Sequence, residues 1–292
     1  MTDAPLDASW EPHTETTTAL VDPGPVAALA ALFDDGLPAP AAGDPLPPLW
    51  HWVALPQWAA SGQLGPDGHP RRGGFLPPVA LPRRMFAGGH VRFHAPLTVG
   101  ETVRRVAEVL SVSPKAGRSG ALVIVDVRTR LFNASGGLAV EEVQNLVYRE
   151  AATPSHGVPP DAPAAADPGV PLHRVSATEW SLRTDPALLM RFSAATANAH
   201  RIHYDWPYAT AVEGYPGLVV HGPLQALALA ETLRLAASAP VLELHHQGRA
   251  PLFCGDPARI RSTPREAGVL LELFGPRGDS AEPNATLDVT TG

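Results

Sequence analysis

Two short stretches of the chain combine residue types that could carry out acid/base chemistry. Asn198, His200, His203 and Asp205 place an amide, two imidazoles and a carboxylate within eight positions. Further along, Gly222 begins a long apolar run with helical spacing. An imidazole moves protons near neutral pH, and the unpaired N–H groups at a helix N-terminus can stabilise a developing oxyanion. These are two of the things that a reaction of a thioester requires.

Both stretches resemble the signature of the MaoC-like hydratase/dehydratases of the hotdog superfamily. The similarity is greatest to a branch whose motif is Asn-x-His-Arg-Ile-His-Tyr-Asp, which here covers residues 198–205. That branch holds mitochondrial-type 3-hydroxyacyl-thioester dehydratases and the mesaconyl-C4-CoA and itaconyl-CoA hydratases. Further similarity lies in four other segments, at residues 46–52, 67–70, 83–90 and 251–257. The resemblance extends over residues 45–290.

The resemblance implies an α+β double hotdog, with two antiparallel sheets each wrapped around a helix and paired edge to edge. It implies an enzyme that reversibly hydrates a 2,3-enoyl thioester to a 3-hydroxyacyl thioester without a cofactor, at a site between the halves. A C4 or C5 dicarboxylic acyl-CoA of the mesaconyl or itaconyl type is the expected substrate. A 3-hydroxyacyl-carrier-protein dehydratase is the alternative enzyme, and a non-catalytic acyl-thioester-binding module is the alternative of another class.

Three residues are the expected catalytic groups. His203 is the general base, and Gly222 at the first turn of its helix supplies the oxyanion donor. Asn198 stands where the larger family has an aspartate, and an amide orients water but cannot ionise. Either His203 handles both protons alone, or another group such as Asp205 supplies the carboxylate. Asp205 could also simply cap the following turn.

Five residues are candidates for substrate binding. Arg83, Arg84 and Arg249 could contact the phosphates of CoA, or they are solvated surface arginines. Arg201 could meet a substrate carboxylate, since it directly precedes Ile202 and His203. His221 either holds its loop or faces the substrate.

Composition and missing motifs exclude several other classes of function. The formal charge of -7 argues against a nucleic-acid partner. No Cys-x-x-Cys, His-Glu-x-x-His or glycine-rich phosphate loop is present, so neither a metal nor a nucleotide cofactor is expected. No apolar run is long enough to cross a membrane, and the N-terminus does not look like a signal peptide. These features predict a cytoplasmic protein. A homodimer is possible.

A segment rich in proline and alanine, residues 151–171, divides the chain. It predicts a degenerate N-terminal hotdog over residues 1–150 and a catalytic MaoC-like hotdog over residues 172–292. In the second half, Asp185 predicts the cap of a helix at 186–196, and a buried helix follows at 222–237. Alternating patterns predict strands at 91–94, 101–111, 121–132, 138–148, 241–247, 258–263, 268–274 and 286–290.

Overall fold

The computed structural model describes residues 10–117, 120–151, 168–276 and 282–292. The first half contains β1 (Thr14–Leu20), α1 (Pro23–Phe33), α2 (His51–Ala54), η1 (Ser61–Gln63), β2 (Arg83–Phe93), β3 (Thr102–Gly117), β4 (Gly120–Phe132) and β5 (Leu138–Arg149). The second half contains β6 (Leu172–Arg174), β7 (Glu179–Leu182), α3 (Pro186–Ala195), η2 (Arg201–His203), η3 (Tyr208–Val212), α4 (Gly222–Leu235), β8 (Val241–Gly248), β9 (Ala258–Arg265), β10 (Gly268–Phe274) and β11 (Ala285–Thr291).

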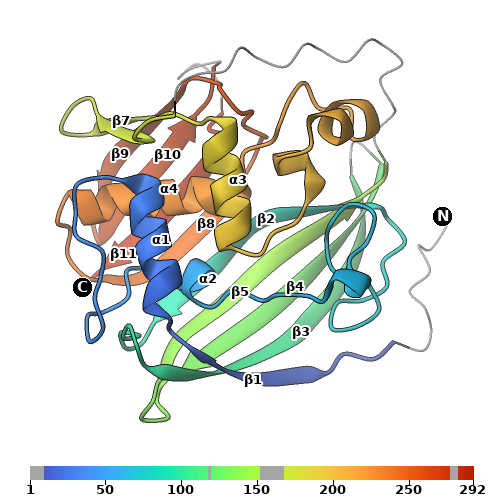
Figure 1. Cartoon of the computed structure of the whole chain (residues 1–292), viewed down its shortest axis with the longest axis horizontal. Helices are drawn as coiled ribbons and strands as arrows, with labels where there is room; N and C mark the ends of the chain where they lie inside the picture. The colour runs from blue at the N-terminus through green and yellow to red at the C-terminus, as the bar shows by residue number, and fades with distance from the viewer. Residues whose placement is uncertain (1–9, 118–119, 152–167, 277–281) are drawn as a thin grey trace.

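The described strands form one antiparallel sheet of 11 strands, in the order β1-β3-β4-β5-β2-β8-β11-β10-β9-β7-β6 (Figure 1). The two halves meet where β2 pairs with β8, and His90 lies opposite His245 there. Two sheets paired edge to edge are the arrangement that the resemblance implies, so the predicted fold class is confirmed. The eight predicted strands coincide with β2–β5 and β8–β11, although β2 begins eight residues earlier than expected.

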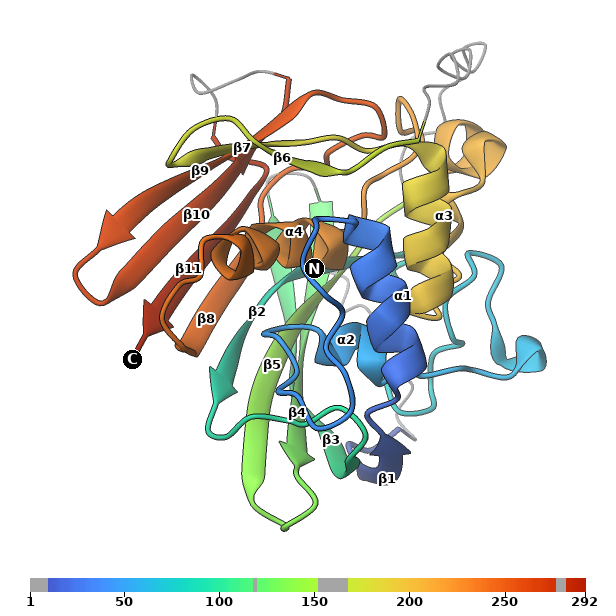
Figure 2. The same ribbon diagram turned by 60° about the vertical axis from the view of Figure 1, so that its left-hand side comes forward.

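Helix α4 is the core of the second half. Its residues 224–233 are all buried, and β10 and β11 pack against it (Figure 2). A helix that a sheet surrounds in this way must be apolar on nearly every side, which explains its composition. Helix α3 begins as predicted, because the side chain of Asp185 accepts a hydrogen bond of 2.9 Å from the backbone N–H of Leu188.

The helices of the first half tie it to the second half. Asp22 caps α1 by accepting a hydrogen bond from the N–H of Gly24, and α1 packs beside α3 (Figures 1 and 2). At the end of α1, Asp35 forms an ion pair with Arg234 of α4, with a separation of 2.9 Å. Helix α2 has only four residues, and α1, with 11, packs on α2 and α3 rather than across the strands, so the first half has no counterpart of the long α4 among the residues described.

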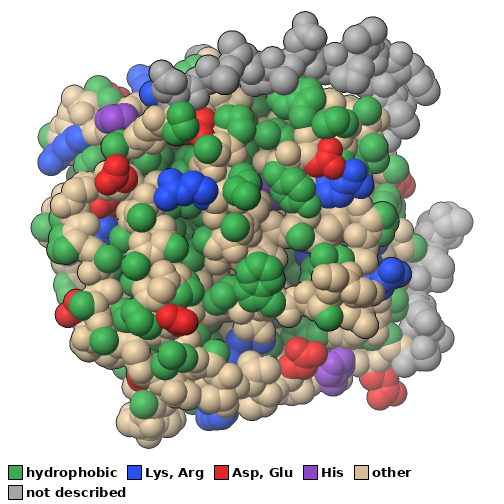
Figure 3. Space-filling model, viewed as in Figure 1, with side chains coloured by type: hydrophobic (Ala, Val, Ile, Leu, Met, Phe, Trp, Pro, Cys, Tyr) green, Lys and Arg blue, Asp and Glu red, His purple; other side chains and the backbone are tan. Residues whose placement is uncertain are grey.

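The predicted linker, residues 151–171, lies almost entirely outside the described residues, so the division into three parts stays a prediction. Within the described residues, no helix has both the length and the apolar character needed to span a bilayer. On the face drawn in Figure 3, the Lys and Arg side chains are scattered rather than gathered into one basic patch.

Candidate active site

A cavity of about 650 Å³ lies between the two halves. The first half contributes lining residues from β2 and β5 and from the loop before β2, and the second half contributes the segment around η2 and the start of α4. Six of the eight predicted site residues line it: His203, Asn198, Gly222, Arg83, Arg84 and Arg249. His221 and Arg201 do not belong to the lining.

His203 is held in the tautomer that a general base needs. Its Nδ1 lies 2.7 Å from the carbonyl oxygen of Val219, so Nδ1 carries the proton and donates it. The lone pair of Nε2 is then left for the cavity. Burial lowers the pKa of His203 to about 4, although the bond to Val219 opposes this shift. The ring is therefore neutral near pH 7.

His221 supports the ring of His203 from outside the cavity. The two rings stack with their centroids 3.6 Å apart, and His221 is completely buried. Its Nε2 lies 2.8 Å from the hydroxyl of Ser193 on α3. Burial lowers the pKa of His221 well below its usual value, with a further contribution from His203. Of its two predicted roles, the structure therefore favours holding the local geometry.

Asn198 follows the end of α3, and its backbone N–H bonds to the carbonyl of Ser193 at 2.9 Å. Its side-chain oxygen accepts a hydrogen bond of 3.1 Å from the N–H of His200. The amide NH₂ group is then the part of Asn198 that can donate to a molecule in the cavity. Asn198 is therefore a hydrogen-bonding residue that lines the same cavity as His203.

Asp205 and Arg201 form an ion pair with each other. The side-chain oxygen Oδ2 of Asp205 lies 2.7 Å from the guanidinium of Arg201, and Oδ1 accepts a hydrogen bond from the N–H of Tyr208 at the start of η3. The guanidinium of Arg201 also lies over the ring of Tyr208, at 4.2 Å. Asp205 is thus a structural cap, and the side chain of Arg201 has its partners outside the cavity.

Gly222 is the first residue of α4, and no side chain caps this N-terminus. Its N–H has no acceptor within the helix, because the first N–H groups of any helix lack one. A Cβ atom at this position would lie 3.0 Å from the ring of Phe86, another lining residue. The positive end of α4 therefore points its backbone at the cavity with little space to spare.

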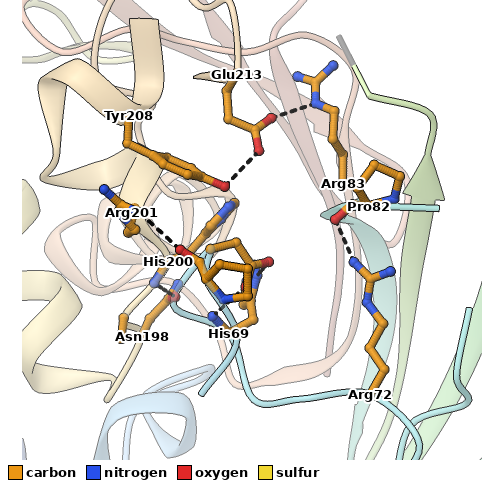
Figure 4. A network of polar contacts seen from close by, with 12 residues as sticks. His69, Arg72, Pro82, Arg83, Asn198, His200, Arg201, Tyr208 and Glu213 are labelled. Atoms are coloured by element: carbon orange, nitrogen blue, oxygen red, sulfur yellow. Dashed lines mark hydrogen bonds and ion pairs between the residues drawn. The ribbon is translucent and has the colours of Figure 1, made fainter. Parts of the chain in front are cut away.

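A loop of the first half brings a further imidazole to the cavity. His69 lines it, with Nδ1 at 3.0 Å from the carboxylate of Asp67 and its ring centroid at 4.0 Å from that of His200 (Figure 4). Gly68 has φ of +90°, and a Cβ atom there would lie 1.8 Å from the carbonyl oxygen of Ala199. The N–H of Arg201 donates to the carbonyl of Asp67 at 2.9 Å. The loop is therefore tied to the catalytic segment of the other half.

All three groups of this cluster have shifted pKa values. Burial lowers the pKa of His69 to about 4, with help from Arg84, and lowers that of His200 to about 2, with help from His69. For Asp67, burial works in the other direction, but the hydrogen bonds and charge of His69 still lower its pKa to about 2. Near pH 7 the cluster thus holds two neutral imidazoles and one carboxylate.

Comparison with known proteins agrees with this geometry. The family model for hydroxyacyl-thioester dehydratase type 2 matches residues 49–254. The chain belongs to this family of thioester dehydratases. It is 44% identical to mesaconyl-C(4)-CoA hydratase of Chloroflexus aurantiacus, with 94% of each chain covered. It is 26% identical to the mitochondrial type 2 hydroxyacyl-thioester dehydratase of Schizosaccharomyces pombe, over 74% of this chain and 77% of the other.

Two solved structures from Mycobacterium tuberculosis share the fold. HtdX superimposes with a TM-score of 0.64 at 21% identity, covering 96% of this chain and 100% of the other. A conserved protein with a double hotdog fold gives 0.53 at 18% identity, covering 98% and 97% of the two chains. The family, the double hotdog and the hydro-lyase class expected from the sequence are therefore confirmed.

A second polar network lies beside the cavity of this protein. The hydroxyl of Tyr208 lies 3.3 Å from Glu213, and the other oxygen of Glu213 lies 2.7 Å from Arg83 (Figure 4). Arg83 also lies over the ring of Tyr215, at 4.9 Å. Its charge is thus already matched by a carboxylate. No sequence motif pointed to Glu213 or to Tyr208.

Three residues at this site of the thioester dehydratase could together bind a metal ion. Asp67, His69 and His200 each offer a ligand atom, and these atoms lie within 4.8 Å of one another. Asp67 is already bonded to the side chain and the backbone of His69, and this pairing alone explains the cluster. A second group of possible ligands, His90, Glu243 and His245, lies outside the cavity lining, where the ring of His245 stacks on that of His90.

Proposed function

We propose that the chain hydrates the double bond of a mesaconyl-type acyl-CoA, with His203 as the general base. The similarity to mesaconyl-C(4)-CoA hydratase over nearly the whole chain supports this substrate class. The observation that carries the mechanism is the bond from Nδ1 of His203 to the carbonyl of Val219. It leaves Nε2 as the only lone pair of the ring, in the cavity that also receives the start of α4.

Hydration needs one proton to leave water and one proton to reach C2. Nε2 of His203 takes a proton from water as the oxygen bonds to C3. The electron pair of the double bond then moves toward C2 and the thioester oxygen, which the N–H of Gly222 stabilises. The imidazolium returns its proton to C2. Because the pKa of His203 is about 4, the ring is a base in nearly every molecule and a ready acid once protonated.

Asn198 acts as a hydrogen-bond donor to water or substrate in this scheme. Its side-chain oxygen is already used by the N–H of His200, so the amide contributes orientation rather than a titrating group. One histidine then handles both protons. The carboxylate of Asp67, in the neighbouring cluster, is bonded to His69. Through this bond it makes the site more polar.

A panel of thioesters tests the proposal. Loss of absorbance of the conjugated enoyl thioester would be followed for mesaconyl-C4-CoA, itaconyl-CoA and crotonyl-CoA, and for an enoyl-carrier protein. We expect the highest kcat/KM for mesaconyl-C4-CoA. A higher value for the carrier-protein thioester would instead identify a carrier-protein dehydratase, and binding without turnover of any substrate would identify a binding module.

A further inference from the structure

Five arginines line the cavity, and their surroundings differ. Arg83 forms an ion pair with Glu213, and Arg149 is also not without a partner. Arg105 lies in the field of Glu15 and Glu142, which raise its pKa against the effect of burial. Arg249 is exposed, as a residue at the entrance of a cavity would be. Arg84 is the remaining member of this group.

Arg84 is partly buried and has no ion pair with a carboxylate among the described residues. Burial lowers its pKa, and this shift is opposed first by the hydroxyl of Tyr148 and then by the charge of the nearby Asp67. That carboxylate, however, is bonded to His69. Burying a cation in the lining of a cavity costs free energy unless an anion is paired with it. Arg84 therefore leaves a positive charge at the cavity that the protein itself does not pair.

The neighbour of Arg84 across the sheet is an uncharged residue. Arg84 of β2 lies opposite Tyr148 of β5, so the two side chains share a face. The buried hydroxyl of Tyr148 is a hydrogen-bond partner of the Arg84 guanidinium, and because burial raises the pKa of Tyr148, this partner is neutral and does not balance the charge of Arg84. Arg72 lies over the ring of Tyr148, at 5.1 Å, and donates hydrogen bonds to the backbone just before β2. These contacts hold the start of β2 in place.

Arg84 lies within electrostatic reach of the reacting groups. Its charge contributes to the lowered pKa values of both His69 and His200. The ring of His200 lies edge-on to that of His203, with the centroids 5.5 Å apart. An anion bound at Arg84 would therefore lie close to the double bond on which His203 acts. In a mesaconyl-C4 group the free carboxylate is attached to C3, the carbon that water attacks.

We propose that Arg84 binds the free carboxylate of a dicarboxylic acyl thioester and so selects charged over uncharged acyl groups. The assignment rests on the proposed function, since it names the residue that recognises that substrate class. The planar guanidinium can hold both carboxylate oxygens at once. The exposed Arg249, in contrast, suits the phosphates that all CoA thioesters share.

The experiment compares kcat/KM for mesaconyl-C4-CoA and for crotonyl-CoA, which lacks the carboxylate. In Arg84→Met we expect the ratio of the two values to fall at least 50-fold. Arg84→Lys keeps the charge but loses the planar fork, so its ratio should lie between those of wild type and Arg84→Met. The matched control, Arg249→Met, should lower both values alike and leave the ratio within threefold of wild type.

An equal loss for both substrates in Arg84→Met would overturn the inference. Should that variant fail to fold, the wild-type protein provides a second measurement with unreactive saturated analogues. Succinyl-CoA should then bind at least tenfold more tightly than butyryl-CoA by calorimetry, and equal affinities would overturn the inference. A wild-type preference for crotonyl-CoA would contradict the proposed function itself, before any variant is made.

Discussion

The two halves build similar sheets but surround them with different partners. In the second half the sheet encloses the long helix α4, whose residues 224–233 are buried. In the first half the helices are α1 and the four-residue α2, and the strands β2 and β5 lend side chains to the cavity instead. A sheet that does not enclose a long helix has a face available for substrate.

The halves also supply different chemistry. His203, Asn198 and Gly222 come from the second half, whereas Arg84 and the pair Asp67–His69 come from the first. The proposed function thus assigns proton transfer to the second half and recognition of the acyl carboxylate to the first. This division predicts that changes in the second half reduce turnover of all substrates, and that changes in the first half alter selectivity and the fit between the halves.

The largest expected effect is that of His203→Ala. Removing the only group proposed to move protons should lower kcat by about 1,000-fold or more. The variant His245→Ala is the control, since His245 is an exposed histidine on β8 outside the cavity. Steady-state rates and circular dichroism of both variants are the measurements. Turnover near the wild-type rate in folded His203→Ala would remove this residue from the mechanism.

The N–H of Gly222 can be tested by a pair of variants. Gly222→Pro removes the donor, and the backbone of His221, with φ −55° and ψ 132°, already suits a following proline. Gly222→Ala keeps the donor. Its Cβ atom makes the same close contact with Phe86 that the Cβ atom of proline would make. We expect Gly222→Pro to lose about 100- to 1,000-fold in kcat relative to Gly222→Ala. Equal rates would mean that the oxyanion is stabilised elsewhere.

A third variant breaks the contact between the halves. Gly68→Ala forces a Cβ atom against the carbonyl of Ala199 and strains a backbone with φ of +90°. Gly36→Ala has a similar strain, with φ of +83°, but nothing within 4 Å of its Cβ. The control should cost about 1–2 kcal/mol in the free energy of unfolding, and Gly68→Ala about 1–3 kcal/mol more. Denaturant unfolding would measure both, and equal costs would show that the loop is not held by this close approach.

Local signals explain which parts of the fold could be predicted. Helix α3 has Asp185 as its cap and Pro186 in its first turn, and α4 is apolar at most of its positions. Strand β1 has no such signal. Most of its side chains are exposed and it shows no apolar alternation, because it is held by pairing with β3, where Thr14 lies opposite Glu108. Such pairing over a long sequence separation leaves no local pattern.

The same distinction applies to the site. His203 and Gly222 could be predicted because each lies in a motif whose residue types suit a thioester reaction. The segment with Asp67 and His69 resembles the same family, but its residue types alone predict no role. Its place at the cavity depends on a contact with Ala199, more than 100 positions away in the sequence. Arg201 lies outside the cavity lining, because its local partner Asp205 occupies its side chain.

Asn198→Asp tests whether position 198 faces the base. The rate should depend on neutral His203, so it falls as the pH drops through a pKa of about 4. A carboxylate at position 198 would stabilise the imidazolium and should move this acidic limb to higher pH by about one unit or more. Asn198→Ala is the control, with a lower rate and no upward shift. An unchanged limb in Asn198→Asp would place residue 198 away from His203.

The pH–rate measurement must be made by brief exposure to acid. His69, His200 and His203 have folded-state pKa values below the usual 6.5. Below pH 6.5 the unfolded chain therefore binds more protons than the folded one. The stability that these neutral rings contribute is complete above pH 6.5 and is lost as the pH falls toward 4 for His69 and His203 and toward 2 for His200. Melting temperatures should fall over this range, and His203→Ala should reduce that dependence.

The smallest expected effect is that of cutting the chain between its halves. A site for a specific protease, placed within residues 152–167, would give two fragments. We expect them to stay associated and active, because β2 pairs with β8, α1 packs against α3, and Asp35 pairs with Arg234. Separation would expose the edges of both strands. Gel filtration and kcat with mesaconyl-C4-CoA, before and after cleavage, are the measurements. A second half that separates and remains fully active alone would show that the first half contributes nothing to the site, and would refute the division of chemistry between the halves.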